Sequence, residues 1–427
     1  MCNYRHSSAH APPRRRTTLT PLAPFQVRSF RFQWPADLAA SLAFEMEALT
    51  LGWYVLVATG SVELLVAFGA LMWVGALFSP FFGMVGDRVG LRTLLCVTRG
   101  GYALLAAVLA ALTLSDSLQP WHVFAIAGLT GLVRPSDAAM RTVLVGQTMR
   151  PEALMGALGI SRTTSDVARI AGALAGAGGV ALVGMGPAYV AITALYVTAF
   201  LFSLGVARPP LQAVHASAAA TLAGLKDGVR YVWSKPELLG GFSITFLVNL
   251  LAFPFLFGLL PYAAKEIFDS GQSGLGYLAA SFSAGALVAS FVVIANHAPL
   301  RAGRVMLWST TAWFVAMLLY GQTRSLPIGL SLLFVSGFLQ TFCLLPVTAV
   351  MLRASSEDMR GRVIGMRMLA IWGIPLGLLA AGPIIASIGY AACTAVFSGL
   401  GLAATVAMGY RWRRALWHPS AAANSHL

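Results

Sequence analysis

Charged residues are scarce in this chain, and acidic residues are the scarcest. Only 10% of the 427 residues are Asp, Glu, Lys or Arg, and 15 acidic residues stand against 29 basic ones. The mean hydropathy of +0.76 is far above that of an ordinary soluble domain. A soluble fold around one large core would need many amphipathic surface helices, and the sequence contains almost none. The composition therefore indicates a polytopic membrane protein.

Motifs for cofactors, metals and secretion are also missing. The four cysteines are far apart, and no cluster of His and Cys has the spacing of a metal site. The glycine-rich stretch "GALAGAGG" lacks the lysine and the strand-to-helix setting of a nucleotide site. The first 30 residues are polar and basic, without the apolar core of a cleaved signal peptide. We therefore expect no cofactor and no metal, and an enzyme or ATP-driven pump is disfavoured.

Long apolar runs dominate what is present. Hydrophobic residues make up 58% of the chain and recur in runs of about 20 residues, the length that crosses a bilayer as a helix. Backbone polar groups find no water partner in lipid, so such runs are expected to be helical. The predicted spans are residues 34–57, 62–84, 93–114, 120–143, 163–184, 187–207, 240–263, 274–296, 305–323, 326–349, 365–386 and 389–410. The predicted fold class is an all-α membrane protein with twelve transmembrane helices.

The longest gap between these runs, residues 208–239, divides them six and six. We expect a disordered basic cytoplasmic tail (1–31), an N-terminal six-helix bundle (32–208), a cytoplasmic link (209–239), a C-terminal six-helix bundle (240–411) and a cytoplasmic tail (412–427). A constant offset pairs Glu152 with Glu357, Gly156 with Gly361, Arg162 with Arg367, Gly172 with Gly377 and Gly184 with Gly389. Such an internal echo is typical of transporters built from two related halves.

Basic residues mark one side of the predicted membrane protein. With a cytoplasmic N-terminus, the arginines and lysines fall mostly in the tails, the link and the cytoplasmic loops, and only Lys265 and Arg324 fall in loops on the opposite side. This asymmetry predicts that both termini are cytoplasmic and accounts for the net charge of +14. A nucleic-acid partner is not expected, because the basic residues form no groove-sized patch. We expect a multi-pass monomer in the lipid bilayer of the plasma membrane.

The loop after the second span carries the most specific motif, "GMVGDRVGLR". It resembles the G-x-x-x-D-R-x-G-R/K-R/K loop of the major facilitator superfamily, a group of twelve-helix secondary transporters. Gly83, Asp87, Arg88, Gly90 and Arg92 match, and Leu91 stands where a basic residue is usual. Three further stretches, "LKDGVRYVWSKPEL", "SSEDMRGRVIGMRM" and "DVARIAGALAG", resemble the drug- and siderophore-exporting branch, although Ala173 replaces the usual proline of the last.

The resemblance implies a gating role for this loop. In the family such a loop latches the two halves together on the cytoplasmic side and favours the outward-facing state, and the partner here would lie near Glu357 and Asp358. The alternative is a solvated basic turn with only a topological role. Glycines allow close helix approach, and Gly172, Gly176 and Gly377 are the candidates for such packing.

Ionisable residues inside the predicted spans are the other candidates for function. An acid or base at mid-helix costs about 2.5–3.5 kcal/mol on insertion scales, so it is expected to face a cavity or a partner. The candidates for proton coupling or substrate binding are Asp37, Glu45 and Glu47 in the first span, Arg134 and Asp137 in the fourth, and Asp166 and Arg169 in the fifth. Arg134–Asp137 and Asp166–Arg169 are each spaced three apart, so each could form a neutralised intrahelical pair.

Glu45 is the first candidate for proton coupling or cation recognition. Asp37, Ser41 and Glu45 recur every four residues and share one helix face, whereas Glu47 points to a different side. Glu45 has no basic residue within a helical turn, and burial favours the protonated form of a carboxylate. The alternative, that Glu45 or Glu47 pairs with a buried arginine of another helix, stays open.

Together these features predict a secondary transporter. The expected activity is proton-coupled export of a small amphipathic or cationic molecule, by alternating access at a site between the two bundles. Two rivals remain: uptake of a nutrient or siderophore by the same fold, and a non-transporting membrane sensor on the same scaffold.

Overall fold

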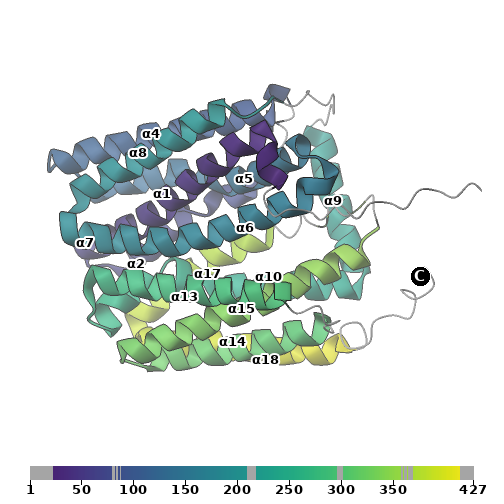
Figure 1. The fold of residues 1–427 in the computed structure, drawn as a ribbon. Coiled ribbons are helices and arrows are strands. Elements are labelled where there is room, and N and C mark those ends of the chain that lie inside the picture. Colours follow the sequence, from purple (N-terminus) through teal and green to yellow (C-terminus); the bar gives the residue numbers. More distant parts are fainter. Residues whose placement is uncertain are drawn as a thin grey trace, which may run out of the picture.

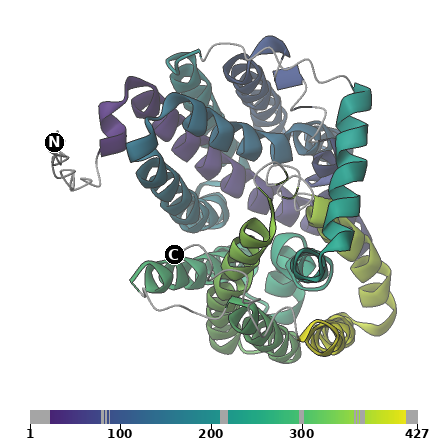
Figure 2. The same ribbon diagram turned by 90° about the vertical axis from the view of Figure 1, so that its right-hand side faces the viewer.

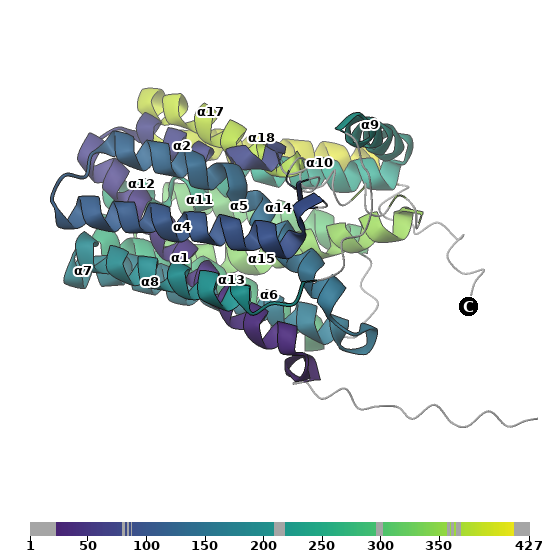
Figure 3. The ribbon, with the colours of Figure 1, turned by 90° about the horizontal axis from the view of Figure 1, so that it is seen from above.

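The computed structural model describes residues 23–78, 82, 85–86, 88–208, 218–295, 302–356, 359, 363 and 369–413, and these residues contain helices and no strand. The helices form two bundles, one coloured purple to blue and the other green to yellow in Figure 1. The spans of both bundles run in nearly the same direction, with their ends at two common faces (Figures 1 and 3). The all-α class predicted from hydropathy is confirmed.

The N-terminal bundle follows the predicted order. Its elements are α1 (Arg28–Thr59), α2 (Val62–Leu71) with the 3-10 turn η2 (Val74–Phe78), α4 (Leu91–Leu114), α5 (Pro120–Thr148), α6 (Pro151–Ala173) with the π turn η3 (Leu174–Gly178) and α7 (Gly179–Val183), and α8 (Met185–Leu204). Local sequence explains several boundaries. Gly60 ends α1 in the left-handed conformation, and the Ser61 side chain accepts a hydrogen bond from the Leu64 amide at the start of α2.

The C-terminal bundle repeats this plan after the link helix α9 (Ala218–Ser234). Its elements are α10 (Pro236–Leu251), α11 (Phe253–Phe257), α12 (Leu260–Tyr262) and the π turn η4 (Ala263–Ile267), then α13 (Gly271–Ala295), α14 (Ala302–Gln322), α15 (Leu326–Ala354), η6 (Ala370–Trp372) with α17 (Gly373–Ile388), and α18 (Tyr390–Arg411). The seventh predicted span is therefore a series of short helices, interrupted around Pro254 and Pro261, where proline removes backbone donors.

Helical segments overlap each of the predicted spans. Within the described residues, nine helices are long and apolar enough to cross a membrane. The other three predicted spans correspond to α2 with η2, to α5, and to α10 with its continuation. Helices α2 and α10 are shorter than the nine, and α5 contains three charged residues.

Two helices begin well before their predicted starts. Helix α1 begins at Arg28, inside the segment expected to be a disordered tail up to residue 31, and α6 begins at Pro151, twelve residues before the predicted span. The first turns of α1 are held by packing, because Phe30 is buried beside Val145 and Ala157. Hydropathy detects only the apolar part of a helix, so it misses turns that extend past the bilayer and pack on neighbouring helices.

The internal echo of the sequence is also present in the backbone. Gly184 and Gly389, paired by the constant offset, both cap a helix with φ 83° and with ψ of 172° and 167° respectively. Gly172 packs against α1 and Gly377 packs against α10, at matching places in the two bundles. Of the other paired positions, Glu357, Gly361 and Arg367 lie outside the described residues. The two bundles are therefore built on one repeated plan.

Candidate functional site

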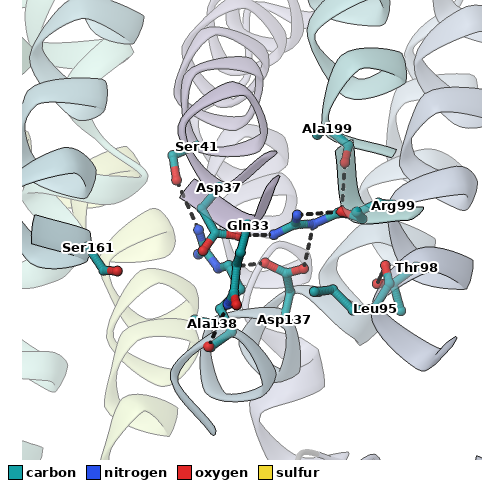
Figure 4. A network of polar contacts seen from close by, with 12 residues as sticks. Gln33, Asp37, Ser41, Leu95, Thr98, Arg99, Asp137, Ala138, Ser161 and Ala199 are labelled. Atoms are coloured by element: carbon teal, nitrogen blue, oxygen red, sulfur yellow. Dashed lines mark hydrogen bonds and ion pairs between the residues drawn. The ribbon is translucent and has the colours of Figure 1, made fainter. Parts of the chain in front are cut away.

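A buried charge network joins four helices of the N-terminal bundle (Figure 4). The Arg99 side chain on α4 is fully buried; it forms an ion pair with Asp37 on α1 and donates to the Ser203 hydroxyl on α8 at 2.7 Å. Its Nε lies 3.7 Å from Asp137 Oδ1 on α5. Because three helices converge on one guanidinium, this network fixes the positions of α1, α5 and α8 around α4.

Asp137 does not form the pair with Arg134 that the spacing allowed. Asp137 instead pairs with Arg141 one turn later, with Oδ2 3.0 Å from Arg141 Nε, and with Arg99. Arg141 also donates to Ser41 Oγ at 3.0 Å. Asp37 and Ser41 thus serve this network rather than a cavity. Spacing along one helix allows a partner three or four residues away, and it does not show that Arg99 of α4 also reaches Asp137.

Asp166 likewise does not form the pair with Arg169 that the spacing allowed. The buried Asp166 carboxylate pairs with Arg162, Oδ2 to Nε 3.3 Å, on the preceding turn of α6. Arg169 Nε lies 3.6 Å from Glu45 Oε1 on α1. Glu45 is therefore paired with an arginine of another helix, the alternative that the sequence left open.

Glu47 occupies a separate environment inside the bundle. Its side chain is buried and accepts a hydrogen bond from the Tyr196 hydroxyl of α8 at 2.8 Å. The hydroxyls of Tyr102 and Tyr189, buried in the same core cluster, have no hydrogen-bond partner among the described residues. The Glu47 side chain thus points into the packed interior of the N-terminal bundle and does not line the space between the bundles.

A cavity of about 110 Å³ lies between the two bundles. Its lining comes from α1, α2, α5 and α6 on one side and from α11, α12 and α13 on the other. It includes Phe44, Glu45, Phe68, Trp73, Arg134, Arg169, Phe257 and Phe282. Glu45, Arg134 and Arg169 are the charged groups of this described lining. Arg134 lies over the Phe44 ring, and its guanidinium carbon is 5.3 Å from the centre of the Trp73 ring. The cavity is therefore aromatic with one ion pair and one further cation.

Close helix contacts between the bundles lie on one side of this cavity. Gly69 on α2 approaches Leu378 of α17 and the Gly258 backbone, and Gly52 on α1 approaches Pro261. Helices α2 and α17 lie side by side in Figure 3. Nearer the start of α2, Gly382 of α17 approaches Val66 and Glu63, so the two bundles also touch at the end of the molecule where α1 ends and α2 begins.

The helix-packing glycines sit at close crossings within each bundle. A Cβ on Gly172 would lie 2.8 Å from Glu45 Cβ, and one on Gly176 would lie 2.6 Å from Met46 Cα. A Cβ on Gly377 would overlap the Leu250 carbonyl of α10. Side chains at these positions would separate α6 from α1 and α17 from α10.

The loop motif can be described only in part. Gly83, Asp87, Glu357 and Asp358 lie outside the described residues, so the latch they would form stays a prediction. Arg88 is exposed, and Gly90 has a φ of 88° at the start of α4. Arg92 donates to the Leu204 carbonyl at the end of α8, within its own bundle.

The family follows from a match over most of the chain. The Major Facilitator Superfamily model matches residues 34–300. The chain belongs to the major facilitator superfamily. It is thus a membrane transporter of small molecules and not an enzyme, as the loop motif implied.

Individual relatives agree with this assignment. The multidrug efflux pump Tap of Mycolicibacterium fortuitum is 27% identical over 321 residues, covering 71% of this chain and 75% of Tap. The nucleoside transporter NupG superposes with a TM-score of 0.68 at 15% identity, covering 90% of this chain and 99% of NupG. A D-xylose-proton symporter superposes with a TM-score of 0.67 at 11% identity, covering 89% and 96%. These structures share the fold with this chain.

Proposed function

We propose that this protein exports a small amphipathic molecule in exchange for protons. The observation that carries the proposal is the cavity between the bundles, which is lined by both halves and contains the Glu45–Arg169 ion pair. The similarity to a multidrug efflux pump supports export as the direction. The cavity of about 110 Å³ is smaller than the ~300–1,000 Å³ of a drug-sized site. The halves must therefore move apart to admit a substrate, as alternating access requires.

The ion pair offers a way to couple protons to this motion. Glu45 on α1 and Arg169 on α6 both line the cavity, and their side chains are 22% and 24% exposed. Protonation of Glu45 removes its charge and with it the attraction to Arg169. The two protonation states then differ in how α1 and α6 are held together beside the substrate, so protonation shifts the conformational equilibrium.

The lining also favours one of the two expected substrate classes. Phe44, Phe68 and Phe257 offer apolar faces. Two guanidinium groups against one carboxylate leave the described lining with a positive balance, which opposes a cation. We therefore propose amphipathic molecules without a net positive charge as substrates.

The membrane placement completes the proposal. The basic loops predict that both termini face the cytoplasm of a plasma-membrane monomer. With this orientation, the end of the molecule where α2 meets α17 is extracellular, and α9 lies on the cytoplasmic side.

Transport in proteoliposomes tests the proposal. Nile red, a neutral amphipathic dye, should accumulate in proteoliposomes with an acidic interior and with the transporter inserted so that its cytoplasmic face is outside. Ethidium, a cation, serves as the comparison and should accumulate less. Accumulation only under the opposite proton gradient would indicate uptake by symport, and no flux of any substrate in a broad panel would indicate a sensor. Either result would overturn the proposal.

A further inference from the structure

The link helix α9 has an orientation unlike that of the spans. In Figure 1 it stands across the direction of the spans, at the end of the molecule where α1 begins and α18 ends. Figure 2, which views that end, shows α9 along the edge of the molecule, from beside the N-terminal bundle to the start of α10. A helix in this position lies parallel to the membrane plane, at the level where the spans leave the bilayer.

One end of α9 is fixed to the C-terminal bundle. Val232 is fully buried in the core cluster of that bundle, and Val229 packs against it. The Lys235 ammonium donates to the Ala354 carbonyl at 2.8 Å, and the Ser356 amide donates to the Tyr231 hydroxyl at 3.0 Å. The helix is therefore held at the end of α15, and the face turned away from these contacts is exposed.

That opposite face carries two cations and an aromatic ring. Lys226, Arg230 and Trp233 are spaced four and three residues apart, which places them on one side of the helix. All three are exposed, and the Trp233 side chain is 62% exposed. Asp227 is the acidic residue of the described end of α9. Basic residues beside a tryptophan on an in-plane helix are typical of binding at the membrane surface.

We propose that this face of α9 binds the headgroups of anionic phospholipids in the adjoining leaflet. The Trp233 ring would insert at the headgroup boundary, where tryptophan is favoured. Lys226 and Arg230 would contact the phosphates, and the exposed Arg353 in the last turn of α15 extends the basic surface. The occupant is lipid and not a soluble anion, because the face lies at the edge of the molecule and includes an exposed apolar ring. This inference does not rest on the proposed transport activity.

Lipid quenching of tryptophan tests the proposal. The full-length protein is placed in phosphatidylcholine nanodiscs with increasing brominated phosphatidylglycerol, and the fluorescence of the Trp233→Phe variant is subtracted to isolate Trp233. We expect strong quenching that saturates at a low fraction of brominated anionic lipid. The Lys226→Gln/Arg230→Gln double variant should need about five- to twentyfold more of that lipid, since each cation contributes about fivefold at an anionic surface.

The controls separate the alternatives. Lys265→Gln/Arg324→Gln removes the same charge at the other end of the molecule, where Arg324 is exposed and Lys265 is half-exposed, and should leave the Trp233 titration unchanged. Soluble glycerol phosphate should not compete with the lipid. Three results would overturn the proposal: Trp233 that brominated lipid does not quench, equal titrations for wild type and the Lys226/Arg230 variant, or displacement by millimolar glycerol phosphate.

Discussion

Replacing Arg99 by methionine should be among the most damaging single changes to the N-terminal bundle. The Arg99 guanidinium is fully buried and pairs with Asp37, whose side chain is 12% exposed and has no other ion-pair partner among the described residues. Removing one partner of a buried pair typically costs about 3–5 kcal/mol, because the other charge stays buried. Asp137 keeps Arg141, at 3.0 Å, so most of the loss should come from Asp37.

Equilibrium unfolding by dodecyl sulfate in mixed micelles measures this loss, with helix content as the signal. Lys265→Met is the control, because Lys265 and its partner Glu266 are both exposed and such a pair contributes about 0–1 kcal/mol. Adding Asp37→Asn to Arg99→Met should recover more than half of the lost stability, since the uncompensated charge is then gone. A loss for Arg99→Met no larger than that of Lys265→Met, or no recovery in the double variant, would refute this account of the network.

Two further predictions concern helix packing and the link. Gly172→Leu should separate α6 from α1, lower stability by about 1–3 kcal/mol and reduce transport. Gly159→Leu, at a glycine with open space around it, should be near neutral. Equal effects of the two changes in transport and unfolding assays would contradict the packing role of Gly172. Hydrogen bonds from Lys235 and Ser356 lower the pKa of the Tyr231 phenol from 10 to about 8, so the anchor of α9 should strengthen as pH rises from 8 to 10 and change little below 8. A tyrosinate absorbance step near pH 8 that is absent in Tyr231→Phe checks this, and a first step only near pH 10 would contradict it.

The fold could be predicted because hydropathy reports a property of each segment by itself. Apolar runs located the helices, and the glycine echo marked the repeat that Gly184 and Gly389 share in the backbone. The ends of α1 and α6 could not be found in this way, since their extra turns are held by contacts such as that of Phe30 with α5.

The partners of the buried charges could not be predicted from spacing. Arg134 and Asp137 are close in sequence, yet Asp137 pairs with Arg99 of α4, and Glu45 pairs with Arg169 of α6. The pairs with Arg99 and Arg169 depend on how helices cross, which one sequence does not report. Asp137 and Asp166 also pair with Arg141 and Arg162, each four residues away on the same helix. The aromatic cavity lining was equally hidden, because Phe44 and Phe282 have the same local pattern as residues that face lipid or the core.

Substrate-induced proton movement is the most direct test of the central claim that Glu45 couples protons to export. Wild-type protein and Glu45→Gln are reconstituted in proteoliposomes containing a pH-sensitive dye, and Nile red is added without an imposed gradient. Glutamine resembles the protonated carboxyl and cannot titrate, so the account predicts proton movement in wild type and none in the variant, with downhill dye exchange still measurable in both. Glu47→Gln, at a carboxylate that faces packing, should retain proton movement. Equal proton flux in wild type and Glu45→Gln would contradict the account.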